Sequence, residues 1–126
     1  MAIRFIKIAV IYLLLGVGLG LYMGMTTQFT LTPVHAHFNL LGWASLALCG
    51  LVYAAFPAAA ETRLAKWHFW LHNLGLPPQM IALALMLTGN AAMGPVVGIL
   101  SMVVAAGIAF FAINIWSAVR PVTVAR

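Results

Sequence analysis

Long uninterrupted runs of apolar residues dominate this chain, and charged residues occur only in the short intervals between them. No Asp, Glu, Lys or Arg lies between Lys7 and Glu61 or between Lys66 and Arg120. Each uncharged stretch is long enough for about two helices of roughly 20 residues, the length that crosses a bilayer. With breaks where turn-forming residues cluster, the pattern predicts four apolar helices, over residues 5–25, 34–56, 67–88 and 95–119.

Composition identifies the class of protein. Hydrophobic residues make up 65% of the 126 residues, charged residues 6%, and the mean hydropathy is +1.11. A soluble domain does not have this composition, so we predict an all-α membrane protein whose helices contact the lipid bilayer. The intervals between the predicted helices leave no room for a soluble domain. The expected architecture is a four-transmembrane-helix bundle that forms one domain over residues 1–126.

The basic residues all fall at one end of the predicted bundle. They are Arg4, Lys7, Arg63, Lys66, Arg120 and Arg126. Positively charged segments stay on the cytoplasmic side of a membrane, so we expect both termini to be cytoplasmic in a multi-pass protein of the prokaryotic cytoplasmic (inner) membrane. The net charge of +5 then reflects topology and attraction to anionic lipid, and no nucleic-acid partner is expected. The same topology places His35 and His37 near the outer face.

His35 and His37 open the second predicted helix, and Asn39 follows them. On a helix, residues two apart are separated by about 200°, so the two histidines point to nearly opposite sides. Asn39 shares the side of His35 and could orient its ring. The pair therefore cannot easily hold one ion, and the interpretations are hydrated side chains at the membrane interface or ligands in two separate haem sites.

His68 and His72 are the other two histidines, and their spacing of four puts both on one face of the third predicted helix. Such a pair suits zinc, copper or a haem edge. The alternative, which the sequence favours, is an aromatic interfacial belt formed with Trp67 and Trp70. A helix from residue 37 to 56 is about 29 Å long, so the two histidine pairs lie at opposite membrane faces within one protomer.

An antiparallel second copy could bring the two histidine pairs together, but the one-sided charge favours a single orientation. If His35 and His37 hold haem, we therefore expect the missing ligand to come from the same helix of a parallel neighbouring copy. His35 of one chain opposite His37 of the next is a heterologous contact. Repetition of that contact closes a ring rather than a two-fold dimer. The oligomer would then be part of the cofactor site.

Several of these residues together resemble a known family. They are His35-Ala36-His37, Gly42-Trp43, Tyr53, Pro57, Trp67-His68-Phe69-Trp70 and Gly75. This set is similar to helices ten and eleven of the catalytic subunit of haem–copper oxidases and nitric oxide reductases, and the last predicted helix is a weaker continuation toward helix twelve. The resemblance implies that His35 corresponds to the ligand of the active-site haem and His37 to a ligand of the low-spin haem. His68 inherits no ligand role from it.

The chain departs from this family in ways that bear on activity. It has no copper-binding histidine trio, no separate partner helix with the other low-spin ligand, and no acidic residue within the predicted helices. We therefore do not expect a complete oxidase or reductase. The outer loops also lack Arg and Lys, so haem propionates would rely on solvent, backbone amides, Gln28, Asn90 or nearby threonines.

The resemblance also suggests an assembly. The family's large subunit has twelve helices in three arcs of four, and the matched helix is the second of its arc, as it is in this chain. We therefore expect a homotrimer with haem b at each interface, three haems per trimer, ligated by His35 of one protomer and His37 of the next. The expected function is that of a small b-type cytochrome that transfers electrons, with a quinone or a respiratory-chain protein as partner. The alternative is a non-redox haem-, gas- or metal-handling or assembly protein associated with respiratory oxidases.

Small residues recur at a helical spacing in the first predicted helix. Gly16, Gly20 and Gly24 follow one another at intervals of four. Residues at this spacing lie on one face, and the absence of side chains lets another helix approach closely. The stripe predicts a helix interface, either within the protomer or between protomers.

Polar residues and prolines inside the later predicted helices need hydrogen-bond partners. Pro77 and Pro78 should kink the third helix and free carbonyls, which Asn73 and Gln79 could satisfy. Asn114 in the fourth helix is most simply an interhelical hydrogen-bond donor. These residues predict structural contacts rather than a transport path.

Overall fold

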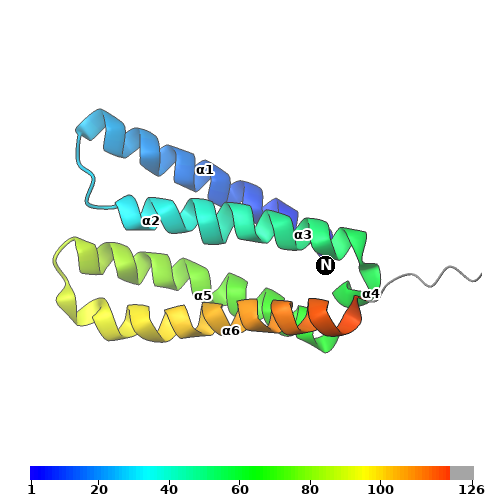
Figure 1. Cartoon of the computed structure of the whole chain (residues 1–126). Coiled ribbons are helices and arrows are strands. Elements are labelled where there is room, and N and C mark those ends of the chain that lie inside the picture. The colour runs from blue at the N-terminus through cyan, green and yellow to red at the C-terminus, as the bar shows by residue number, and fades with distance from the viewer. Residues whose placement is uncertain (120–126) are drawn as a thin grey trace, which may run out of the picture.

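A computed structural model describes residues 1–119, which form helices and contain no strand. Four long helical rods alternate in direction along the chain (Figure 1). The second rod is continuous but is divided by its hydrogen bonding into an α-helix, a π-helix and an α-helix. In chain order the elements are α1 (Ala2–Thr26), α2 (Thr32–His37), η1 (Phe38–Ala44), α3 (Ser45–Ala55), α4 (Pro57–Ala60), α5 (Arg63–Leu87), η2 (Ala91–Met93) and α6 (Gly94–Ala118).

The predicted helices agree with these bounds to within a few residues. The largest difference is at α5, which begins at Arg63 rather than at the predicted residue 67. Thr62 caps this helix, because its Oγ1 accepts a hydrogen bond from the Ala65 N–H at 3.0 Å. The basic residues Arg63 and Lys66 therefore belong to the first turn of α5 and not to a loop.

Three of the four rods are long and apolar enough to cross a membrane, namely Ala2–Thr26, Thr32–Ala55 and Ala91–Ala118. The helix α5 does not reach the same hydropathy, because it carries histidines, Asn73 and Gln79 along its length. Many large apolar side chains also point away from the bundle. Ile3, Leu14, Met25, Met102 and Trp116 are each more than 65% exposed. Apolar surface of this kind suits contact with lipid.

The rods pair into two hairpins, α1 with the rod from α2 to α3, and α5 with α6 (Figure 1). The loops between hairpin arms lie at one end, and the N-terminus and α4 lie at the other. Arg4 and Lys7 near the start of α1 share that second end with the first turn of α5. The predicted grouping of charge therefore holds for the basic residues within 1–119, whereas Arg120 and Arg126 lie outside the described residues.

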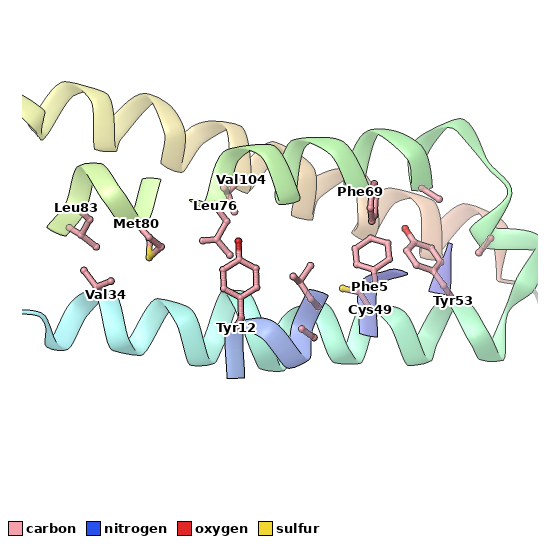
Figure 2. Close-up of a cluster of buried hydrophobic side chains, with 14 residues drawn as sticks. Phe5, Tyr12, Val34, Cys49, Tyr53, Phe69, Leu76, Met80, Leu83 and Val104 are labelled. Carbon is pink, nitrogen blue, oxygen red and sulfur yellow. The ribbon is translucent and has the colours of Figure 1, made fainter. Parts of the chain in front are cut away.

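An aromatic cluster joins the two hairpins near the basic end. Figure 2 shows Phe5, Tyr53 and Phe69 converging from α1, α3 and α5. The Phe5 ring stacks on the His68 ring with centroids 4.8 Å apart and meets the Phe69 ring edge-on at 5.2 Å. From α6, the ring of Phe111 meets that of Tyr53 edge-on at 5.6 Å. Since these rings come from all four rods, the cluster fixes how the hairpins pack.

The π-helix η1 is the main irregularity of the second rod. Its wider turns are marked by the Ser45 N–H, which bonds to the Leu40 carbonyl five residues earlier. Gly42 lies within it, and a Cβ atom there would overlap the Tyr12 ring of α1. The glycine therefore lets this ring pack directly against the π-helix. Single π turns inside α-helices are often associated with functional sites.

Candidate functional site: two pairs of histidines

His35 lies between α2 and α1 in the same chain. Its Nδ1 is 2.8 Å from the Gly16 carbonyl oxygen, and because a carbonyl only accepts, Nδ1 carries the hydrogen. In the neutral ring, Nε2 is then left with its lone pair. A Cβ atom on Gly20 would lie 2.8 Å from His35 Cε1, so the glycine provides the space for the ring.

The predicted glycine stripe is therefore an interface within the protomer at Gly16 and Gly20. A Cβ atom on Gly16 would lie 2.6 Å from Asn39 Nδ2, just as one on Gly20 would collide with His35. Gly24 has no atom within 4 Å of such a position. The first two glycines thus admit the polar side chains of the second rod, and the third faces open space.

Asn39 lies beside His35 on the same side of the rod, as the helical spacing predicts. Its Nδ2 donates to the His35 main-chain oxygen at 2.9 Å and is 3.5 Å from each ring nitrogen. The two longer distances are at the limit for hydrogen bonds, so the main-chain contact is the firm one. Asn39 therefore limits the movement of the ring, and its contact with Nε2 is weaker than its bond to the main-chain oxygen.

His37 is held in a different way from His35. Its Nδ1 is 2.7 Å from the carbonyl oxygen of Pro33, one turn earlier in the same helix. The carbonyl again accepts, so Nδ1 carries the hydrogen and Nε2 keeps its lone pair in the neutral ring. The side chain is half-buried.

This donor chemistry fits an axial ligand of haem iron. Metal-binding histidines characteristically donate the other ring N–H to a carbonyl, which fixes the ring and raises its basicity. His35 and His37 both show this arrangement. Residues 1–119 contain no cluster of three or more His, Cys, Asp or Glu that could hold a metal ion. His35 and His37 leave α2 in nearly opposite directions, so an iron held by either one would need its second imidazole from elsewhere.

A cavity of about 510 Å³ lies at the end of the bundle where α2 begins. Its polar lining comes from Gln28, Thr30 and Thr88, and Tyr22 and Leu87 contribute apolar surface. Gln28 is one of the side chains expected to meet haem propionates. Asn90, expected beside it, does not line this cavity.

His68 and His72 are completely buried, each 0% exposed. The prediction of an interfacial aromatic belt is therefore wrong for the two histidines. It describes Trp67 and Trp70 better, since these are 57% and 54% exposed on the outside of the same helix. The histidines face inward because the spacing of four keeps both on the side of α5 that meets the other helices.

Each buried histidine has a hydrogen-bond partner in the first hairpin. His72 Nε2 is 3.0 Å from the Leu41 carbonyl of the π-helix, and His68 Nδ1 is 3.1 Å from the Tyr53 hydroxyl. Asn114 Nδ2 lies 3.5 Å from the same hydroxyl and donates to the Ala59 carbonyl at 2.8 Å. The expectation that Asn114 bonds between helices is thus confirmed.

The second nitrogens of the buried pair complement each other. His72 must donate from Nε2 to the Leu41 carbonyl, so in the neutral ring its Nδ1 is an acceptor. The Tyr53 hydroxyl can donate to His68 Nδ1, and the hydrogen of the neutral His68 ring then lies on Nε2. Neither His68 Nε2 nor His72 Nδ1 has a partner within residues 1–119. The rings lie on successive turns of α5 with centroids 5.7 Å apart. Zinc or copper would need further ligands from outside the described residues.

Asn73 and Gln79 do not satisfy the carbonyls freed by the prolines of α5. Asn73 Nδ2 donates to the Phe69 carbonyl at 2.7 Å, and Gln79 Nε2 donates to Ser101 Oγ at 2.8 Å. That prediction was wrong because these side chains find closer acceptors, one turn back and on α6. Pro77 and Pro78 lie inside α5, which runs without a break from Arg63 to Leu87.

Tyr53 is the residue that sequence reasoning did not connect to the histidines. It is 15 residues from His68 and 61 from Asn114, so no local pattern indicates the contact. The one signal is that Tyr53 and Asn114 are polar side chains within apolar helices, and such side chains need hydrogen-bond partners.

Comparison with protein families, with curated proteins and with solved structures finds no match to this chain. Its function must therefore be argued from the geometry of these two histidine pairs.

Proposed function

We propose that this protein is a small b-type cytochrome of the prokaryotic cytoplasmic membrane, in which His35 and His37 provide the axial ligands of haem b. One observation carries the proposal. Both rings donate Nδ1–H to a main-chain carbonyl, Gly16 in one case and Pro33 in the other. In each neutral ring Nε2 keeps the lone pair that would bind iron.

The proposal includes a site shared between copies. His35 and His37 are two residues apart on α2, so their side chains leave the helix in nearly opposite directions. Each would serve a different iron, with His35 of one protomer opposite His37 of the next. Three copies would close the ring as a homotrimer with three haems.

In this arrangement the chain's own residues position the two ligands. Gly20 leaves space for the His35 ring, and Asn39 packs beside it. The polar cavity near Gln28 is the proposed location for propionates. Bound haem would supply one-electron oxidation and reduction, and two axial imidazoles leave iron no free position for activating oxygen. Electron transfer to or from a quinone or a respiratory-chain protein follows as the proposed role.

The proposed topology has four membrane crossings with both termini in the cytoplasm. The helix α5 has the lower hydropathy, but three polar side chains beyond its first turn face the bundle, since His68 and His72 are fully buried and Gln79 is 4% exposed. A helix whose polar groups bond to protein neighbours can cross a bilayer. The basic residues at the end formed by the N-terminus and α5 favour the cytoplasm for that end.

An absorption spectrum of the purified full chain tests the proposal. We expect sharp low-spin bands on reduction with dithionite that do not shift with carbon monoxide. His35→Ala and His37→Ala should each abolish these bands, because either change removes one of the two ligands from every shared site. Ala36→Ser, between the two histidines, is the matched control and should leave the spectrum unchanged.

Four results would count against the proposal. A colourless protein that cannot be reconstituted with haem would end it. Low-spin bands that survive in either histidine variant would exclude shared ligation, as would native mass spectrometry that finds only monomers or dimers. A shift with carbon monoxide would replace electron transfer by the gas-binding alternative.

A further inference from the structure

A cavity of about 250 Å³ lies on the outside of α5, near the basic end of the bundle. It is lined by two basic and two aromatic residues, Arg63, Lys66, Trp67 and Trp70. Separations of three and four residues place these side chains on one face of the helix. All four are exposed, whereas His68 on the opposite face is fully buried. The cavity is therefore open to the surroundings of the bundle and is separate from both histidine pairs.

The walls of this cavity are almost wholly apolar. The indole rings and the aliphatic stems of the two basic residues therefore form them. The charged groups of Arg63 and Lys66 extend toward water, because long basic side chains cover apolar surface with their stems and keep their charges hydrated. Glu61, the one acidic residue of the sequence, does not line the cavity. An apolar recess beside two positive charges fits an amphiphile with an anionic head.

The length of the cavity along α5 corresponds to the boundary of a bilayer. Arg63 and Trp70 are separated by about 10 Å along the helix at 1.5 Å per residue. The headgroup layer on each side of a membrane is about 6 Å thick, so with Arg63 at headgroup level Trp70 reaches the first part of the acyl chains. Beyond it, the same face continues with Leu74 and Ile81, which are 65% and 64% exposed. An acyl chain can thus follow α5 away from the basic end.

We propose that this cavity binds an anionic phospholipid, with its phosphate at Arg63 and Lys66 and its glycerol and upper acyl chain against Trp67 and Trp70. Arginine and lysine both bind phosphate, arginine through paired hydrogen bonds. A free phosphate ion would leave the apolar walls unfilled. A zwitterionic phospholipid would bring an ammonium group toward two positive charges, which repel it. The inference rests on the proposed membrane placement and assigns the bilayer partner a headgroup class and a position.

Native mass spectrometry of the full chain in a nonionic detergent measures the headgroup preference. Phosphatidylglycerol and phosphatidylcholine with identical acyl chains are titrated in separate samples, and the concentration that half-saturates the first bound lipid is determined for each. We expect phosphatidylglycerol to act at about a tenfold lower concentration, because each basic residue near a lipid surface gives about a fivefold gain for an anionic headgroup. Glycerol 3-phosphate at the concentration of the lipid should not displace it, since it has no acyl chain.

Two pairs of matched variants connect the preference to the cavity. Arg63→Gln and Lys66→Gln each remove one charge from the lining, and each should lower the preference about fivefold. Arg4→Gln and Lys7→Gln remove the same charges at the same end of the bundle but outside the lining. Each of these two controls should keep the preference of the unaltered chain.

Three results would overturn the proposal. Equal half-saturation by the two lipids would exclude selection of an anionic headgroup. Losses in Arg4→Gln and Lys7→Gln as large as those in the lining variants would indicate general attraction to positive charge, and displacement by glycerol 3-phosphate would indicate a site for soluble phosphates. The lipid is counted by mass and requires no haem, so failure here would leave the low-spin spectrum of the proposed cytochrome unaffected.

Discussion

The two histidine pairs of this protein are built from the same side chain and have different environments. His35 and His37 are half-buried, and their Nδ1 atoms are tied to carbonyls near the loop end of the bundle. His68 and His72 are fully buried and bond to the Tyr53 hydroxyl and the Leu41 carbonyl in the other hairpin. The first pair bonds within one hairpin, whereas the second pair links the two hairpins. The spacing of residues along a helix determines the side on which a histidine lies, and the neighbouring helices determine its burial and its hydrogen-bond partners.

The largest expected effect separates the pairs by stability. His68→Ala removes a ring that stacks on Phe5 and leaves the Tyr53 hydroxyl without its acceptor. We expect a loss of about 3–5 kcal/mol in the free energy of unfolding, as for other large side chains deleted from a core. His37→Ala, whose hydrogen bond is exposed, should cost about 0.5 kcal/mol or less. Unfolding by denaturant in mixed micelles measures both, and equal losses would remove the distinction between the pairs.

A smaller effect tests the space around His35. Gly20→Ala should displace the ring, because the new Cβ atom would lie 2.8 Å from Cε1. Overpacking of this kind costs about 1–3 kcal/mol. If His35 is a haem ligand, the low-spin bands should weaken as well. Gly24→Ala is the matched control and should change neither stability nor spectrum, since that site is open. If both alanines behave alike, the packing described for Gly20 is incorrect.

The smallest expected effect concerns the link between hairpins. Tyr53→Phe keeps the ring and removes the hydroxyl that meets His68 Nδ1 and Asn114 Nδ2. A buried polar group left without its partner costs about 1–2 kcal/mol. Tyr22→Phe, at a tyrosine that is 53% exposed, should leave the unfolding midpoint unchanged. If Tyr53→Phe unfolds at the same midpoint as the unaltered chain, the hydroxyl contributes nothing to the contact between the hairpins.

The sequence predicted the all-helical class and the rough bounds of the long helices because apolar runs and charge gaps mark them directly. It misplaced the start of α5, where the cap provided by Thr62 extends the helix through basic residues that resemble a loop. It did not predict the π-helix, since no local residue pattern demands it. Gly42 is tied to it only through a contact with Tyr12, 30 residues away.

For the candidate sites too, local helix geometry was predictable from the sequence and contacts between distant residues were not. The shared side of His35 and Asn39 follows from helix geometry, and the structure places the two side by side. The burial of His68 and His72 depends on Tyr53, Leu41 and the neighbouring helices, so exposed tryptophans on the same helix misled the prediction. Haem, the trimer and the redox role stay predictions, because each depends on a molecule or a second copy outside a single chain.

The π-helix η1 also determines how this protein should tolerate a change in length. A π turn accommodates one more residue than an α-helical turn, so removal of one exposed residue such as Leu40 would restore a regular helix. The parts of the rod on either side would keep their facing directions, with His35 toward α1 and Tyr53 toward α5. The carbonyl that serves His72 would return to the helical ladder. A one-residue deletion could thus detach a single cross-hairpin contact while sparing the rest, and natural relatives that are one residue shorter at this point should have lost the histidine at that position.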